Sequence, residues 1–464
     1  MSEADRISKD SLGEVRVPYD AYWGPQTQRA IENFPISGLR LPRRFIRAQG
    51  IIKWAAAKAN GEVGALERRV ADAIMQAADE VIDGKWDSQF VVDVYQAGAG
   101  TSQNMNANEV IASRAAELLG GSRGDVTLVH PNDQVNMAQS TNDTIHVAIH
   151  IAAAEALVHD LGPALSSAQN VLAQKAEQWM PIVKSGRTHL QDAVPMRLGQ
   201  EVGGWAGAIS YWRSQMGAVL EQLYGIGIGG NAVGTGINAH PQYRARVTEA
   251  VAEKTGLGFQ QPENMFTFIQ NMDAVLATSG WLRGLATAWG KIANDIRLLS
   301  SGPRTGLAEL ILVPVQPGSS IMPGKVNPVM AEMMNMICFQ VFGNDLAVQS
   351  AVSAGQLELN VMMPVAAYNV LHSIHILHTG VATFERKALL QLDVDVDRVA
   401  GYVEMNTALA TALNPYLGYD QAAVVAKAAY AEGKTVREVV LERGLMSEAD
   451  LKVALDLERM TPVE

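Results

Sequence analysis

The chain has 464 residues, of which 48% are hydrophobic and 18% charged, so it can bury a large core and is too apolar for a disordered protein. Its net charge of −11 lacks the basic excess of a nucleic-acid binder and does not favour anionic membranes. The single cysteine, Cys338, excludes a disulfide framework and a Cys-based zinc site. The N-terminal segment MSEADRISKD has no apolar signal core, and no apolar run has the length of a membrane span. We therefore expect a cytoplasmic globular protein with no nucleic-acid or membrane partner.

Long segments without proline dominate the middle of the chain. Proline is absent from 196–240, 263–302, 329–363 and 365–414, and these segments are rich in helix-forming residues. In 272–300, apolar residues recur mostly at steps of three and four, which predicts one helix through nearly the whole segment. Alternating strand patterns are scarce. The sequence therefore predicts an all-α fold with a long central helix bundle.

Changes in proline content and charge divide the chain into three predicted domains. Residues 1–139 form a turn-rich N-terminal domain, 140–394 the central helix-bundle domain and 395–464 a shorter, more charged C-terminal domain. The segment 329–342 (VMAEMMNMICFQVF) is apolar on nearly every side, so a helix there must be buried all round. We therefore expect a homo-oligomer with the central helices at its centre.

The segment 317–328 (PGSSIMPGKVNP) is the strongest functional signal in the chain. Its glycines and prolines interrupt an otherwise helical sequence, and a surface loop is the simplest interpretation of such a segment. The loop nevertheless carries two hydroxyls, an ammonium and a carboxamide with almost no ordinary solvating charge. This inventory suits binding a carboxylate and delivering a hydroxyl, as active-site loops often do.

Three further polar clusters interrupt apolar sequence. Residues 98–109 place amides and hydroxyls after glycines and before a predicted helix, where free N–H groups attract anions. An ordinary helix cap explains this cluster equally well. Residues 139–143 (QSTND) and 186–192 (GRTHLQD) are short polar segments that we expect between apolar helices. His130-Pro-Asn132-Asp133 is most simply a turn with an Asx cap.

Two patterns resemble nucleotide-binding motifs, but each lacks a feature that its motif requires. Gly225–Gly230 matches the GxGxxG pattern but follows a helical segment rather than a strand. Gly324-Lys325 resembles the end of a phosphate loop, but Ser319 replaces the first glycine and Val326 the magnesium-binding hydroxyl residue.

Taken together, four strings resemble one family. In chain order, GAGTSQNMNANEV, QSTND, GRTHLQDAVP and GSSIMPGKVNP are similar to the motifs of the fumarase/aspartase family of dicarboxylate lyases. The resemblance extends from WGPQTQRAIENFPIS near the N-terminus to the last domain. It implies an all-α fold of three domains, a homotetramer with a twenty-helix core, and active sites shared between subunits. It implies a small dicarboxylate substrate and neither a metal nor an organic cofactor.

The resemblance also implies roles for particular residues. Enzymes of this family remove a proton from the carbon next to a carboxylate and form fumarate, so the carbanion must spread its charge into that carboxylate. Lys325 and Asn327 would bind this carboxylate together with backbone amides of 318–325, and such preorganised donors are the main catalytic resource. Ser319 would be the general base, as an alkoxide stabilised by N–H groups and a lysine. His189, paired with Glu332, would hold or activate the leaving group.

Other matched positions would contact ligands without reacting. The substrate contacts implied by the resemblance are Thr101, Ser140, Thr141, Asn142 and Thr188. A secondary anion site described in fumarases matches His130, Asn132 and Asp133.

The sequence carries features of two different lyases. WGPQTQR, GGNAVGTGINAHPQY and Met363-Pro364 are similar to fumarases, whereas GAGTS, QSTND and AGQLELNV are similar to aspartases. We favour a class II fumarate hydratase, which adds water to fumarate to give L-malate. The alternatives are an aspartate ammonia-lyase and a catalytically idle structural relative.

Overall fold

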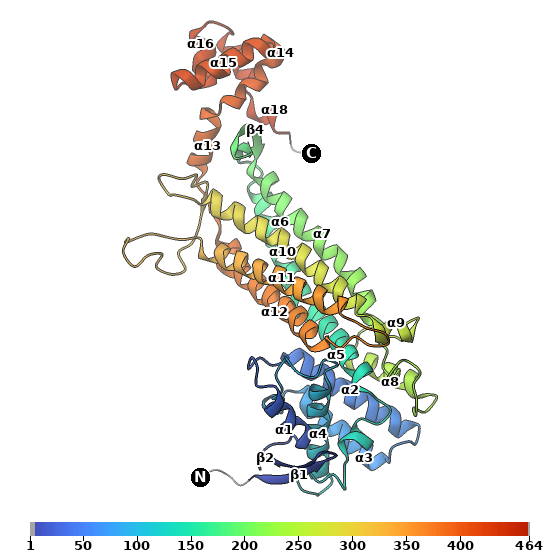
Figure 1. Cartoon of the computed structure of the whole chain (residues 1–464). Helices are drawn as coiled ribbons and strands as arrows, with labels where there is room; N and C mark the ends of the chain where they lie inside the picture. The colour runs from blue at the N-terminus through green and yellow to red at the C-terminus, as the bar shows by residue number, and fades with distance from the viewer. Residues whose placement is uncertain (1–4, 463–464) are drawn as a thin grey trace. The chain divides into compact units, whose positions relative to one another are not determined.

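The computed structural model of the chain describes residues 5–462. Helices make up most of these residues, and the strands in this part of the chain form three two-stranded antiparallel sheets (Figure 1). The all-α fold class predicted from the sequence is confirmed. The described residues divide into two compact units, with unit 1 formed by 5–163, 214–286 and 339–378, and unit 2 by 164–213, 287–338 and 379–462. The three-domain division at residues 139 and 394 stays a prediction.

Unit 1 is built from a hairpin and a set of short and medium helices. These are β1 (Arg6–Asp10), β2 (Gly13–Val17), α1 (Pro25–Asn33), α2 (Arg43–Glu62), α3 (Arg68–Ile82), the 3₁₀ turn η1 (Asp87–Gln89), α4 (Thr101–Leu118), the π-helical turns η2 (Pro131–Val135) and η3 (Leu157–Leu161), α5 (Thr141–Ala156), α8 (Tyr243–Thr255) and α9 (Met265–Gln270).

Four long helices contribute residues to both units: α7 (Leu198–Tyr224), α10 (Asp273–Leu299), α11 (Val329–Ser353) and α12 (Met363–Lys387). Unit 2 further contains nearly all of α6 (Gly162–Gln178) and the hairpin β3 (Val183–Thr188) with β4 (Gln191–Arg197). Its remaining elements are β5 (Leu310–Ile311), η4 (Leu389–Gln391), β6 (Asp393–Val394), α13 (Val396–Met405), η5 (Thr407–Leu413), α14 (Asn414–Leu417), α15 (Tyr419–Glu432), α16 (Val436–Glu442), α17 (Glu448–Ala454) and α18 (Leu457–Met460).

The core of unit 1 is formed around helix α2. Phe45, Ile51 and Ile52 of this helix are fully buried, and the helix packs against α3, α5 and α8. Helix α5 is buried from Asp143 to Ala156, so both helices have almost no solvent face. Such helices form only inside a core, because their apolar surface must be covered on every side.

The predicted helix over 272–300 is present as α10, which spans Asp273–Leu299. Its apolar positions recur at helical spacing, and Leu282, Leu285 and Trp289 are fully buried. In unit 2, the Trp289 ring packs edge-on against Phe384 of α12 with ring centroids 6.1 Å apart. In residues 5–462, no helix combines the length and hydropathy needed to cross a bilayer.

Helix α11 departs from the expectation that it is buried on all sides. Met334 and Cys338 are fully buried, but Met336, Phe339 and Leu346 are 63%, 63% and 64% exposed in the isolated chain. These three residues recur at intervals of three and seven, so they lie along one face of the helix. The single chain therefore leaves part of this apolar helix uncovered.

Gly98 marks the closest approach between distant segments of unit 1. A Cβ at this position would lie 1.9 Å from the carbonyl oxygen of Val361, closer than any real contact. The Gly98 carbonyl also accepts a hydrogen bond from the Met363 N–H at 3.1 Å. Glycine is therefore required here by space, just before the start of α4.

We expect Gly98→Ala to lower the free energy of unfolding by about 2 kcal/mol, because the added methyl forces the two segments apart. The matched control is Gly401→Ala in the exposed part of α13, where a Cβ would meet no atom within 4 Å. That change should raise stability by about 0.5–1 kcal/mol, since alanine is the better helix former. Urea unfolding of both variants tests the pair, and equal stabilities would contradict the steric explanation.

Candidate active site

The loop between β5 and α11 encloses a hollow of its own. The segment 314–326 lines a cavity of about 560 Å³, to which both Ser319 and Lys325 contribute. The base of the loop is closed by hydrogen bonds from the Gly318 N–H to the Lys325 carbonyl (3.0 Å) and from Asn327 Nδ2 to the Gly318 carbonyl (2.6 Å). The structure therefore brings the predicted base, ammonium and carboxamide of this loop into one small region.

The hydroxyl of Ser319 is positioned as an acceptor. Its Oγ accepts hydrogen bonds from the N–H groups of Ile321 (3.2 Å) and Met322 (3.1 Å). Donors aimed at an oxygen stabilise negative charge that develops on it. Lys325 is exposed and forms no ion pair among the described residues, so its charge is available to an anion in the hollow.

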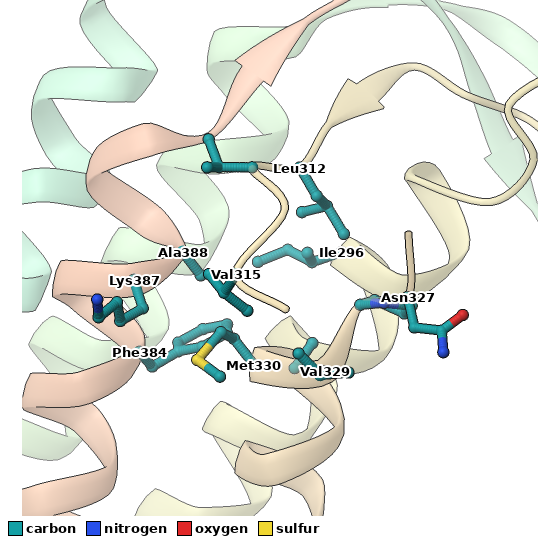
Figure 2. Close-up of a pocket in the computed structure, with 12 residues that line it drawn as sticks. Ile296, Leu312, Val315, Asn327, Val329, Met330, Phe384, Lys387 and Ala388 are labelled. Atoms are coloured by element: carbon teal, nitrogen blue, oxygen red, sulfur yellow. The ribbon is translucent and has the colours of Figure 1, made fainter. Parts of the chain in front are cut away.

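A small apolar pocket anchors the ends of this loop. Val315 on one side and Val329 on the other line it together with Ile296 and Phe384 of the long helices (Figure 2). Asn327 stands at its edge, and Figure 2 shows its carboxamide directed away from the apolar side chains. The polar part of the loop is therefore held by its two apolar ends. Glu332 follows in the first turn of α11, where it is half-buried.

Thr188 and His189 lie at the tip of the β3–β4 hairpin. Thr188 pairs with Gln191, and the two residues between them, His189 and Leu190, have positive φ angles of 53° and 59°. Two-residue hairpin turns with two positive φ angles normally use Asn or Gly, so this turn is strained. Both Thr188 and His189 are exposed. The expectation that 186–192 lies between helices was wrong, because the pairing of β3 with β4 supplies a sheet that weak local alternation did not indicate.

A buried charge cluster supports this hairpin. Glu309 is fully buried and forms ion pairs with Lys184 (2.9 Å) and Arg187 (2.6 Å), both on β3. Lys184 is also buried and pairs with Glu201 of α7 at 2.7 Å. One carboxylate therefore fixes the strand that leads into the turn at His189.

The predicted contact residues of unit 1 lie at two helix N-termini. Thr101 is the first residue of α4, and Ser140 is the N-cap of α5, with a capping box completed by Asp143. Asn104 of α4 donates from Nδ2 to Thr141 Oγ1 at 3.4 Å, which joins the two helix starts. Asn142 donates from Nδ2 to the Ala232 carbonyl at 2.7 Å. Unpaired N–H groups at such termini favour anions.

Two buried ionisable groups near these termini were not singled out from the sequence. Lys53 of α2 is buried and donates to Asn104, Asn136 and Gln139, and burial lowers its pKa to about 7. Asp143 is buried and accepts from the N–H groups of Ser140, Gly229 and Asn231, and burial raises its pKa to about 6. A lysine inside the apolar string GIIKWAAA was the available signal for the first of these groups.

The predicted secondary anion site lies on η2. His130 caps this turn, because its Nδ1 accepts from the Asp133 N–H at 3.0 Å. The expected Asx cap was wrong, since the histidine ring rather than Asn132 or Asp133 supplies the acceptor. His130 and Asn132 line a cavity of about 530 Å³ that Arg6 and Lys9 also line. The site therefore has cations within reach, and its function stays a prediction.

The predicted residues thus fall into two groups. Thr101, Ser140, Thr141, Asn142 and the secondary trio belong to unit 1, whereas Thr188, His189, Ser319, Lys325, Asn327 and Glu332 belong to unit 2. Within residues 5–462, no group of three or more His, Cys, Asp or Glu side chains could hold a metal ion.

We expect Glu309→Gln to lower the free energy of unfolding by about 3 kcal/mol, because it leaves two cations on β3 without their buried partner. Glu201→Gln is the control, since Glu201 is partly exposed and its pair should contribute about 1 kcal/mol or less. Urea unfolding measures both changes. Equal losses in the two variants would show that Glu309 does not hold the hairpin.

Comparison with known proteins accounts for the whole chain. The profile of the lyase family matches residues 13–343, and that of the fumarase C C-terminus matches 409–462. A class II fumarate hydratase of Halobacterium salinarum is 52% identical over 461 residues, covering 99% of this chain and 98% of that protein. An aspartate ammonia-lyase of a Bacillus species is 47% identical over 456 residues, covering 98% and 97%.

Solved structures give the same result. The recombinant class II fumarase of Schistosoma mansoni superposes with a TM-score of 0.95 at 36% identity, covering 98% of this chain and 99% of that one. A fumarate lyase:delta crystallin from Brucella melitensis, bound to cobalt, gives a TM-score of 0.95 at 43% identity with the same coverage. The motifs, the helical fold and these matches together show that the chain belongs to the fumarase/aspartase family of lyases.

Proposed function

We propose that this chain is a class II fumarate hydratase, which reversibly adds water to fumarate to give L-malate. The observation that carries the proposal is the 317–328 loop, in which Ser319 Oγ accepts two N–H bonds and shares a hollow with Lys325. This arrangement suits a serine base and a carboxylate partner. Among the relatives, the hydratase of Halobacterium salinarum is 52% identical and the ammonia-lyase of the Bacillus species 47%, which favours water over ammonia.

In the proposed dehydration, Ser319 acts as an alkoxide and removes a proton from the carbon next to one carboxylate of malate. The electron pair moves into that carboxylate, which then carries two negative oxygens. Lys325 stabilises this charge as a cation, and one ammonium at ~4 Å contributes roughly 4 kcal/mol at an effective dielectric near 20. Asn327 and the loop N–H groups add hydrogen bonds to the same oxygens.

The second half of the reaction expels the hydroxyl group. The carbon–oxygen bond breaks as the electron pair returns to form the double bond of fumarate, and the hydroxyl takes a proton and leaves as water. We assign the supply of this proton to His189 with Glu332, directly or through an ordered water. The other carboxylate of the substrate would be bound by Thr101, Ser140, Thr141, Asn142 and Thr188.

We further propose that the working protein is a homotetramer, with active sites shared between subunits and α11 in its core. The stripe of Met336, Phe339 and Leu346 supports this, because a monomer gains nothing by exposing three large apolar side chains on one helix face. An apolar face of this kind is covered when copies of the same helix pack together.

Loss of fumarate's ultraviolet absorbance tests the reaction. We expect the purified protein to consume fumarate without ammonium and to form malate. A loss that requires ammonium would identify the ammonia-lyase instead, which the aspartase-like GAGTS and QSTND strings support. No loss under either condition would favour the idle structural relative.

We expect Ser319→Ala to reduce kcat by about 10³-fold, because it removes the proposed general base. Ser320→Ala is the matched control, since the neighbouring hydroxyl is exposed and takes no part in the proposed chemistry. Steady-state rates of both variants test the role of Ser319, and thermal melts show whether both variants are folded. Near-normal turnover in the Ser319 variant would remove it from the base role.

A further inference from the structure

The ammonium of Lys53 is fully satisfied by neutral acceptors. Its Nζ donates to Asn104 Oδ1 (2.8 Å), Asn136 Oδ1 (2.9 Å) and Gln139 Oε1 (2.9 Å), and the residue is 1% exposed. A lysine ammonium has three N–H donors, so each is used once. No carboxylate contacts it among the described residues, and Asp143 acts on it only through its charge. Unit 1 therefore holds a buried amine whose protonated form has no contacting counterion.

This ammonium decides how the surrounding amides are turned. Because it accepts no hydrogen bonds, the carbonyl end of each of the three amides must face it and each NH₂ must face away. The NH₂ of Asn136 then donates to the Gln139 carbonyl at 3.3 Å, and that of Gln139 to the Val135 carbonyl at 3.0 Å. The ammonium of Lys53 thus fixes the segment that precedes Ser140.

Asn104 transmits this orientation to Thr141. Its Oδ1 faces Lys53 and also accepts from Thr144 Oγ1 at 3.2 Å, so its Nδ2 is left to donate to Asn136 Oδ1 at 3.2 Å and to Thr141 Oγ1 at 3.4 Å. A hydroxyl that accepts from inside the protein keeps its own hydrogen for a partner outside. Thr141 is half-buried at the N-terminus of α5, where N–H groups already favour an anion.

We propose that Lys53 is a positioning residue for substrate: its ammonium turns the Asn104 amide so that Thr141 directs its hydroxyl hydrogen at a substrate carboxylate. This inference rests on the proposed function, in which Thr141 contacts a dicarboxylate. It predicts that Lys53 acts mainly on substrate binding and acts through Thr141.

The affinity for the dicarboxylate should then depend on the protonation state of Lys53. Its folded pKa is lowered by burial to about 7, and only the protonated ammonium requires the carbonyl ends of all three amides to face it, so substrate binding is strong below this pH and weakens above it. Among the ionisable groups on the elements packed against α2, Asp143 acts on Lys53, and burial together with the charge of Asp143 raises the pKa of Tyr243 of α8.

The remaining ionisable groups of those elements are engaged elsewhere or face other surroundings. Ion pairs join Asp72 to Arg68, Asp79 to Lys254, Glu80 and Glu117 to Arg114, Glu155 to Arg47, Arg246 to Glu62 and Glu253 to Lys58. The carboxylate of Asp133 lies beside the His130 ring. Glu109 accepts from the N–H groups of residues 24, 26 and 27, and Arg244 donates to backbone carbonyls. His146 and His150 line a separate cavity, and burial lowers the pKa of each, so both are neutral.

The test compares Lys53→Met with Lys58→Met, a control on the same helix whose ammonium pairs with Glu253 near the surface. Two readouts are used: KM and kcat for fumarate, and the Kd for succinate, an unreactive dicarboxylate, by calorimetry. We expect Lys53→Met to raise both KM and Kd about 10- to 100-fold with kcat changed about threefold or less, whereas Lys58→Met matches the wild type. Wild-type KM and Kd in the Lys53 variant would overturn the proposal.

A double-mutant cycle with Thr141→Val tests the route. We expect the Kd of the double variant for succinate to be no higher than that of the single variant with the higher Kd. The reason is that both changes remove the same interaction, the one between the substrate and a Thr141 hydroxyl oriented by Lys53. Additive losses would overturn action through Thr141. A wild type that leaves fumarate unchanged refutes the proposed function, while the succinate comparison still decides the role of Lys53.

The pH profile keeps the proposal testable if Lys53→Met does not fold. We expect the Kd of the wild type for succinate to rise about tenfold between pH 6.5 and 8.5, and this rise to be much smaller in Thr141→Val, which retains Lys53. A wild-type Kd that stays constant across this range would overturn the proposal, as would an unchanged rise in the Thr141 variant.

Discussion

Backbone N–H groups that helices and tight turns leave without carbonyl partners determine where this chain can hold negative charge. Three N–H groups bind the carboxylate of Asp143, and three others bind that of Glu109. Two more point at Ser319 Oγ. The polar motifs stand at such places because only there can a folded backbone offer donors without breaking a helix. The proposed chemistry of a dianionic substrate uses the same resource.

The two units provide different kinds of donor. Unit 1 offers neutral donors at the starts of α4 and α5, with a buried lysine behind them. Unit 2 offers an exposed lysine on a loop and a histidine on a strained hairpin. Under the proposed function, the fixed neutral donors of unit 1 suit the carboxylate that keeps its charge, and the cationic loop of unit 2 suits the carboxylate that gains a second negative oxygen.

Much of the fold could be predicted from the sequence, because a helix leaves a local pattern of apolar residues and proline-free segments. The 3.6-residue period of 272–300 and the absence of proline predicted α10, and the Gly/Pro content of 317–328 predicted the loop. The β3–β4 hairpin was missed because its strength comes from pairing and from the buried Glu309, while its turn, His189-Leu190, lacks the usual Asn or Gly. The cap at His130 was missed because histidine is an uncommon capping residue.

The candidate site was harder to predict from the sequence, because its residues are joined by contacts between segments that are far apart along the chain. The resemblance supplied the residue roles, but nothing local in the sequence links Lys53 to Asn104 and Gln139. A lysine in an apolar helix is ordinarily expected to extend its charge to solvent. Only the packing of α2 against α4 and α5 turns this side chain into the centre of an amide cluster.

The discontinuity of unit 1 has a consequence for biosynthesis. Gly98 meets Val361 and Met363 directly, so the segment just before α4 is bordered by residues more than 260 positions later. A nascent chain on the ribosome cannot complete this contact until Met363, the first residue of α12, has been synthesised and has left the ribosome. Until then, the N-terminal part of unit 1 lacks these contacts and keeps apolar helix surface uncovered. Exposed apolar surface of this kind favours the binding of chaperones during translation.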